Sequence, residues 1–220
     1  MAPPAFSPFE VPKLPAKLPV AISVARVENE KTVLYRCLPA LLLSCALGSA
    51  PAASLDAPGV PNFHQVNEHV YRGGQPAGAG WNSLATLGIK VVVDLRPESE
   101  HPVQAEARAV QAAGMRYVNV PMRGMGAPMA EGVLKVLALL ESDAGSVFVH
   151  CKRGCDRTGT VIACYRILHD HWENQKALKE ARSLGMYPIE RGMMHYILNF
   201  NPAIAPPADS VLAAASAGLQ

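Results

Sequence analysis

Two short runs of apolar, largely β-branched residues constrain the fold of this chain more than any other feature. Residues 89–95 read Ile-Lys-Val-Val-Val-Asp-Leu, and residues 146–150 read Ser-Val-Phe-Val-His. Runs of this kind, with little polar alternation, are typical of strands buried on both faces of a parallel sheet. Helical patterns lie between the two runs, so the sequence predicts parallel strands joined by helical crossovers.

The other elements follow the same alternation. Shorter strands are predicted at Phe63–Asn67, Val70–Arg72 and Tyr117–Val120. Helices are predicted at Trp81–Leu87, Pro102–Ala113, Glu131–Glu141, Thr158–His169, Asn174–Leu184 and Ile189–Asn199. We therefore expect an α/β fold, a three-layer sandwich with a mostly parallel central sheet flanked by helices. The catalytic domain is expected to span 60–201, between an N-terminal extension (1–30, then 31–53) and a flexible tail (202–220).

Residues 31–53 have the layout of a secretory signal. Lys31 and Arg36 precede the apolar stretch Leu38–Ala50, which is too short to span a bilayer comfortably and is followed by small residues. Ala50–Ala52 offers a cleavage site, and Cys45 offers a lipoprotein-type site instead. The segment begins late in the chain, which favours a downstream start codon or a long basic region. We expect a periplasmic or lipid-anchored protein if the segment is a signal, and a cytoplasmic one otherwise.

The segment from His150 to Gly159, His-Cys-Lys-Arg-Gly-Cys-Asp-Arg-Thr-Gly, carries the predicted chemistry. It joins a buried strand to a helix at the carboxyl end of the strand, where α/β sheets bind ligands. The start of a helix offers free backbone N–H groups and a positive dipole end. Gly154 permits the tight turn that lets successive N–H groups converge on one point. The sequence therefore predicts an anion site.

The side chains of this loop suit phosphoryl transfer. Cys151 is the predicted nucleophile, because convergent N–H groups and a helix dipole favour a thiolate. Arg157 can hold two phosphate oxygens and stabilise charge in the transition state. Thr158 can assist departure of the sulfur, and His150 is expected to order the loop. Phosphate is expected to bind to Lys152, Arg153, Gly154, Cys155, Asp156 and Arg157.

The expected reaction consists of two displacements at phosphorus, through a thiophosphate intermediate on Cys151 that water then hydrolyses. No metal or cofactor is expected, because Arg157 and the loop N–H groups supply the electrostatic stabilisation.

The sequence His-Cys-x5-Arg-Thr-Gly resembles the signature of the protein-tyrosine-phosphatase superfamily. Val70–Pro76, Val91–Arg96 and Ala163–Leu168 extend the resemblance, which covers roughly Phe63 to Asn199. The chain is similar to small bacterial members of the atypical dual-specificity group, which are related to fungal and plant enzymes that act on inositol pyrophosphates. The resemblance implies the cysteine phosphatase fold and activity on phosphate esters.

One part of the family pattern is missing. Family members usually place an Asp, the general acid, on the loop before the signature, but Val120–Ala130 contains no carboxylate. Asp156 is the first candidate for the acid, as in lipid phosphatases of the myotubularin type; it could instead hold the loop. Asp94 or Glu98 is the second candidate, and a leaving group that needs little protonation is the third possibility. A phenol has a pKa of about 10 and a phosphate of about 6, so phosphotyrosine and phosphoanhydrides remain candidates, whereas phosphoserine is disfavoured.

Basic residues around the loop suggest anionic substrates. Lys152 and Arg153 could select inositol phosphates or phosphoinositides, or could support phosphate binding in general. Arg72 and Arg123 could extend this basic rim, whereas Arg96 is expected to pair with a nearby carboxylate.

The expected partner is a phosphorylated protein, an inositol phosphate or a phosphoinositide. With 20 Lys and Arg against 18 Asp and Glu, the chain shows no general attraction to nucleic acid. We expect a monomer that reaches a membrane only through its N-terminal segment. Two alternatives to catalysis stay open: a non-catalytic phosphate-binding module, and a thiol redox protein that uses Cys151 and Cys155. A zinc site at these cysteines is disfavoured because Arg157 would repel the ion.

Overall fold

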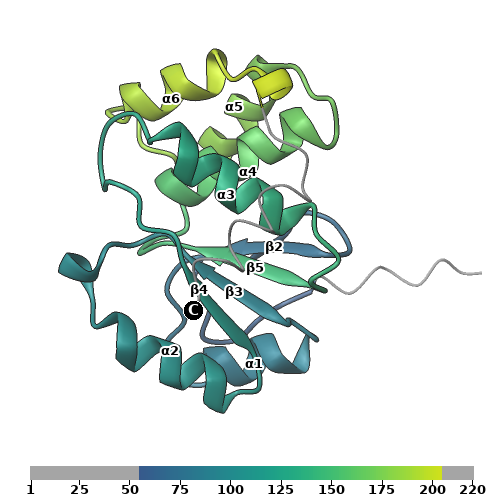
Figure 1. Ribbon diagram of the computed structural model, residues 1–220, viewed down its shortest axis with the longest axis vertical. Coiled ribbons are helices and arrows are strands. Elements are labelled where there is room, and N and C mark those ends of the chain that lie inside the picture. Colours follow the sequence, from purple (N-terminus) through teal and green to yellow (C-terminus); the bar gives the residue numbers. More distant parts are fainter. Residues whose placement is uncertain (1–54, 205–220) are drawn as a thin grey trace, which may run out of the picture. The chain divides into compact units, whose positions relative to one another are not determined.

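The computed structural model describes residues 55–204 (Figure 1). The predictions for residues 1–30 and 31–53 lie outside this range, as do those for the tail beyond a short 3-10 helix η2 (Pro202–Ile204). Within 55–204, no helix has both the length and the apolar character needed to cross a bilayer. The predicted signal and the domain boundaries therefore stay predictions.

The five predicted strands are confirmed and form one sheet. They are β1 (His64–Gln65), β2 (Val70–Gly73), β3 (Val91–Asp94), β4 (Arg116–Asn119) and β5 (Val147–His150). The spatial order is β1-β2-β5-β3-β4. Only the β1–β2 pair is antiparallel, and the pairs β2–β5, β5–β3 and β3–β4 are parallel. The sheet is therefore mostly parallel, with β5 at its centre.

The helices complete the three predicted layers. They are α1 (Gly80–Thr86), α2 (Val103–Ala112), α3 (Ala130–Leu140), α4 (Asp156–Leu168), α5 (Asn174–Ser183) and α6 (Arg191–Leu198). Figure 1 shows α1 and α2 on one face of the sheet and α3 to α6 on the other. A 3-10 helix, η1 (Glu98–Glu100), was not predicted. Helix α4 begins two residues earlier than expected, so Arg157 lies inside its first turn.

Alternation along β5 explains why this strand is apolar throughout. Phe148 packs in the apolar cluster beneath α1 and α2, whereas Val147 and Val149 pack in the cluster beneath α3 to α6. Successive strand residues point to opposite faces, so a strand covered by helices on both faces needs apolar residues at every position. The fully buried β5 is thus a rigid support for the residue that follows it, Cys151.

The register of the sheet brings the ends of three strands together. His150 at the end of β5 pairs with Gly73 of β2 on one side and with Asp94 of β3 on the other. Because parallel strands end at the same edge of a sheet, the segments that follow β2, β3 and β5 meet there. This edge contains every predicted site residue of the loop 150–158.

Candidate active site

The loop after β5 packs tightly on the glycines that end β2. Gly154 has a φ of +72°, and a Cβ on it would lie 2.3 Å from the carbonyl carbon of Gly73 and 2.5 Å from the nitrogen of Gly74. The backbone N–H of Gln75 also donates to the carbonyl of Lys152 at 3.2 Å. Only glycine combines this conformation with such a close approach of two backbones. Gly154 and Gly73 therefore shape the loop jointly.

The Gly154 carbonyl of the loop is bonded on the side away from the cavity, whereas the backbone N–H groups of the loop have no protein acceptor among residues 55–204. The Gly154 carbonyl accepts hydrogen bonds from Arg72 Nη2 at 2.6 Å and from Asn62 Nδ2 at 3.1 Å. Among residues 55–204, no protein acceptor binds the backbone N–H groups of residues 152–158. A trans peptide points its C=O and N–H in opposite directions, so an outward carbonyl turns the next N–H inward. Unsatisfied amides at the start of a helix form an anion cradle.

The predicted catalytic residues meet in this cradle. Cys151 is 3% exposed and Arg157 is 6% exposed. Thr158 is fully buried, and its hydroxyl has no partner among the described residues, which leaves it free for the sulfur. A cavity of about 340 Å³ opens above them, lined by Gly124, Cys151, Lys152, Arg153, Asp156 and Arg157. The nucleophile and the arginine thus line the same cavity, as phosphoryl transfer requires.

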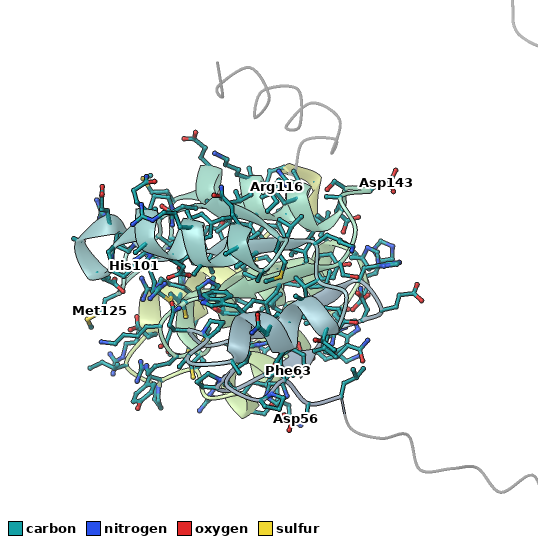
Figure 2. All side chains as sticks on the ribbon, turned by 90° about the horizontal axis from the view of Figure 1, so that it is seen from below. Asp56, Phe63, His101, Arg116, Met125 and Asp143 are labelled. Carbon is teal, nitrogen blue, oxygen red and sulfur yellow. The ribbon has the colours of Figure 1, made fainter. Side chains whose placement is uncertain are left out.

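A larger cavity, of about 600 Å³, lies elsewhere and is lined by residues such as Glu141, Asp143 and Tyr165. Figure 2 shows Asp143 far from Met125, which belongs to the loop beside the active site. This cavity contains no residue of the 150–158 loop, so the smaller one is the candidate active site.

Glu100 holds Arg157 in place, and sequence reasoning missed it. Its two carboxylate oxygens accept from Arg157 Nη1 and Nη2, each at 2.8 Å. The Met122 carbonyl also lies 3.4 Å from Nη1. This bidentate pair uses the end of the guanidinium and leaves the edge formed by Nε and Nη2 available for phosphate oxygens. The sequence pointed to Asp94 and Glu98 in the same segment, as candidates for the acid. The 3-10 helix η1 instead places Glu100 against Arg157.

Asp156, the first candidate for the general acid, has both carboxylate oxygens occupied. Oδ1 accepts from the backbone N–H of Tyr187 at 2.9 Å, and Oδ2 accepts from Arg153 Nη2 at 2.8 Å. The ring of Tyr187 in turn lies 4.1 Å from the Arg153 guanidinium. These contacts favour the alternative role, in which Asp156 holds the loop against the segment before α6. Its role in catalysis stays a prediction.

Two of the basic residues lie where the rim was expected, and two do not. Lys152 and Arg153 line the cavity, and the Arg153 side chain is 49% exposed. Arg123 is exposed but lines a different, small cavity. The expectation for Arg72 was wrong: the side chain is 1% exposed and lies behind the loop, not on its rim. A strand residue that pairs with β5 points into the layer of helices, which the sequence alone did not reveal.

The second acid candidate, Asp94, is fully buried in an ionic network beside the loop. Arg96 Nε and Nη2 donate to its two oxygens at 3.0 Å each, and the Tyr117 hydroxyl donates at 2.9 Å. Burial would raise the pKa of Asp94, but the hydrogen bonds from Arg96 and the charges of His150 and Arg96 outweigh it and lower the pKa. An acid must give up a proton, so this carboxylate is unsuited to that role. The predicted pairing of Arg96 with a carboxylate is confirmed.

The same network reaches His150, whose role in ordering the loop stays a prediction. His150 Nε2 lies 3.1 Å from Glu106 Oε1, and Glu106 also pairs with Arg96. Donor atoms of Asp94, His101 and Glu106 lie within 4.8 Å of one another, which is close enough for a metal ion. Arg96 already forms ion pairs with Asp94 and Glu106, however. Its guanidinium therefore supplies the positive charge that a metal ion would otherwise provide.

The sulfur of Cys155, the second cysteine of the redox alternative, packs against Asn62 and Gly185. Its sulfur accepts from Asn62 Nδ2 at 3.6 Å, and a Cβ at Gly185 would lie 2.9 Å from it. Burial, together with the nearby charges of Asp156 and Cys151, raises the pKa of the Cys155 thiol. A thiol held in the neutral form is a poor nucleophile, which argues against the redox alternative.

The loop that usually carries the acid is fastened to α6. The backbone N–H of Gly126 donates to Glu190 at 3.4 Å, and a Cβ on Gly192 would lie 2.4 Å from the nitrogen of Ala127. Met125 projects from the loop and is 64% exposed (Figure 2). The loop thus lies beside the cavity, where it contributes Gly124 and no carboxylate.

The site combines a buried cysteine at the end of a strand, a glycine turn with free backbone amides, and an arginine held in place by a carboxylate. Together these features define a cysteine-dependent phosphatase of the dual-specificity type. Residues 56–192 match the family described as a DSP-PTPase phosphatase fused to NAD+ kinase, and the chain belongs to this family. A putative tyrosine-protein phosphatase, OCA1 of Mycosarcoma maydis, is 34% identical over 125 residues, 56% of this chain and 78% of that protein. The dual specificity protein phosphatase TpbA of Pseudomonas aeruginosa is 29% identical over 164 residues, 70% and 72% of the two chains.

A solved structure has the same fold. The core catalytic domain of the PP-IP phosphatase SIW14 from S. cerevisiae, in complex with citrate, superposes with a TM-score of 0.58 at 26% identity. The match covers 74% of this chain and 96% of that one. The predicted fold and the predicted superfamily are both confirmed.

Proposed function

We propose that this phosphatase acts on phosphotyrosine in proteins, with Cys151 as the nucleophile. The observation that supports this substrate most directly is the cradle of free amides around Cys151 and Arg157, combined with the lack of a carboxylate on the loop 120–130. Such a site stabilises the phosphoryl group well but protonates the leaving group poorly. It therefore suits a phenolate, which departs more readily than the alkoxide of serine or threonine.

The proposed reaction has two steps. The Cys151 thiolate attacks phosphorus, the P–O bond to the tyrosine breaks, and the phenolate takes a proton from solvent. Water then attacks the phosphorus of the phosphocysteine and gives up a proton to solvent, the S–P bond breaks, and the sulfur leaves as a thiolate that the Thr158 hydroxyl stabilises. In both steps Arg157, oriented by Glu100, and the loop amides hold the equatorial oxygens. No proton donor from the protein is needed for a leaving group of moderate basicity.

The rim of the cavity offers a surface for an aromatic ring. Tyr187 is 48% exposed and stacks on Arg153, which lines the cavity. Aromatic pairs prefer offset or edge-to-face contacts, and the exposed ring of Tyr187 can make one with a phosphotyrosine. TpbA and OCA1, named as dual specificity and tyrosine phosphatases, agree with this substrate class.

Inositol pyrophosphates are the second candidate. Lys152 and Arg153 add two positive charges to the rim, which favours a substrate with several phosphate groups. A phosphate leaving group also needs less protonation than a phenolate. The name of SIW14 as a PP-IP phosphatase agrees with this candidate.

A panel of substrates decides between the two. The measurement is kcat/KM for a phosphotyrosine peptide, a phosphoserine peptide, a phosphoinositide and an inositol pyrophosphate, followed by phosphate release. We expect the phosphotyrosine peptide to rank first and the phosphoserine peptide last. A higher kcat/KM for the inositol pyrophosphate would replace the first candidate by the second.

The variant Cys151→Ser separates catalysis from binding. It should abolish hydrolysis of para-nitrophenyl phosphate but retain phosphate binding, whereas Cys155→Ser should stay active. Absence of turnover in the wild type, with identical phosphate binding in Cys151→Ser, would instead indicate a non-catalytic phosphate-binding module. Loss of activity in Cys155→Ser as well would support the redox alternative.

A further inference from the structure

Arg72 is a buried cation that forms no ion pair with any carboxylate among residues 55–204. Its side chain is 1% exposed, and Nη2 donates to the Gly154 carbonyl at 2.6 Å. Nε and Nη1 are buried and have no hydrogen-bond partner among residues 55–204. Glu180, whose charge acts on Arg72, bonds through both oxygens to Arg166. Burial lowers the pKa of Arg72, as expected for a guanidinium that lost water without gaining a carboxylate.

The guanidinium lies directly behind the phosphate loop. Arg72 pairs with Val149, two residues before Cys151, because β2 and β5 are neighbours in the sheet. Its Nη2 lies 3.8 Å from the Cβ position of Gly159 in the first turns of α4. Arg72 thus lies where the strand that carries the nucleophile, the loop and the helix meet. A side chain this deep inside the protein cannot contact a substrate.

A buried charge without a partner is costly unless an opposite charge compensates it. Glu180 acts on Arg72 without bonding to it, because Arg166 binds both of its oxygens, and the other anions near Arg72 are those of the reaction, on the other side of the loop. The charge of the Cys151 thiolate acts on Arg72. In a low-dielectric interior, a fixed charge acts strongly over the thickness of one loop.

We infer that Arg72 is a positioning residue whose buried charge stabilises the Cys151 thiolate and the bound phosphate from behind the loop. The inference rests on the proposed role of Cys151 as the nucleophile. The bond to the Gly154 carbonyl adds a second effect: it turns that carbonyl outward, so the N–H of Cys155 points into the cradle. Arg157 holds the phosphate from the front, whereas Arg72 acts only through the loop.

Three variants separate charge from hydrogen bonding. Arg72→Lys keeps the charge, and Arg72→Gln keeps a donor for the Gly154 carbonyl without a charge. Asn62→Ala is the matched control, because Asn62 Nδ2 donates to the same carbonyl at 3.1 Å but is neutral. Far-UV circular dichroism and thermal unfolding establish that each variant is folded.

Two readouts do not depend on turnover. One is the pH midpoint for alkylation of Cys151 by iodoacetamide, followed by mass spectrometry. The other is the dissociation constant of inorganic phosphate, measured by protection against alkylation. Other charged and titratable groups near Arg72 and the loop stay unchanged in all variants; they are His64, Glu100, His150, Lys152, Arg153, Cys155, Asp156, Arg157, Arg166 and Glu180.

We expect Arg72→Gln to raise the alkylation midpoint by about one pH unit and to weaken phosphate binding about tenfold. Arg72→Lys and Asn62→Ala should stay close to the wild type in the midpoint. A folded Arg72→Gln protein with the wild-type midpoint would overturn the inference, as would an equal shift in Arg72→Lys. If Arg72→Gln does not fold, Arg72→Met takes its place as the uncharged variant, and a wild-type midpoint in that folded protein would likewise overturn the inference.

Failure of this inference differs from failure of the proposed function. If Cys151 is not the nucleophile, wild-type turnover persists in Cys151→Ser or is absent from the start. If only the role of Arg72 is wrong, turnover requires Cys151 while the alkylation midpoint is insensitive to Arg72.

Discussion

Replacing Glu100 tests how the active-site arginine is held. The two hydrogen bonds from Arg157 to Glu100, each 2.8 Å long, fix the guanidinium of a residue that lines the cavity. Hydrogen bonds to charged groups contribute about 1.5–3 kcal/mol. The Glu100 side chain is 29% exposed, so solvent screening favours the lower end of that range. A loss of about 1.5 kcal/mol corresponds to about tenfold in kcat/KM.

The assay compares Glu100→Gln with the wild type on para-nitrophenyl phosphate and on phenyl phosphate. Because Glu100 acts through Arg157, both substrates should lose kcat/KM by the same factor, although their leaving groups differ in basicity. Glu98→Gln is the matched control, since Glu98 lies in the same short helix, is exposed and is not among the residues that line the cavity above Cys151. An unchanged kcat/KM in Glu100→Gln would refute the reasoning. A much larger loss on phenyl phosphate would instead make Glu100 the proton donor.

Three further changes test other contacts. Asp156→Asn removes the ion pair with Arg153, whose side chain is 49% exposed, and should lower the Tm by about 2–4 °C; a selective loss on phenyl phosphate would restore Asp156 as the acid. Gly154→Ala places a Cβ 2.3 Å from the Gly73 backbone at a φ of +72° and should abolish phosphate binding and turnover; near-normal kinetics would contradict the described packing. The pKa of Asp94 is lowered below 3.8 on folding, so its contribution to stability is present above that pH and is lost as the pH falls further. Urea unfolding of the wild type should therefore show a falling midpoint below about pH 4, and Asp94→Asn should be less stable at neutral pH but less sensitive to acid.

The sequence alone predicted the elements and the centre of the site because both depend on local patterns. The apolar run that ends at His150 predicts a strand buried on both faces, since helices must cover each side. Gly154 and the helix that follows the loop predict an anion site, since backbone N–H groups at a helix start have no other partner. Cys151 and Arg157 belong to one contiguous motif, so their roles required no knowledge of distant segments.

The roles of side chains that come from distant segments were decided only by the tertiary structure. Glu100 lies 57 positions from Arg157, and the unpredicted 3-10 turn brings it, not Glu98, to the guanidinium. The sequence left open that Arg72 extends a basic rim, but pairing of β2 with β5 turns it into the interior behind the loop.

The physical reason is that local sequence sets which residues form a strand, a turn or a helix start, whereas strand order sets which of them become neighbours. The order β1-β2-β5-β3-β4 places the ends of β2 and β3 on either side of the nucleophile. Hydrogen bonds and charge pairs act over a few ångströms. The support of the phosphate loop therefore follows from the sheet, while its chemistry follows from the motif.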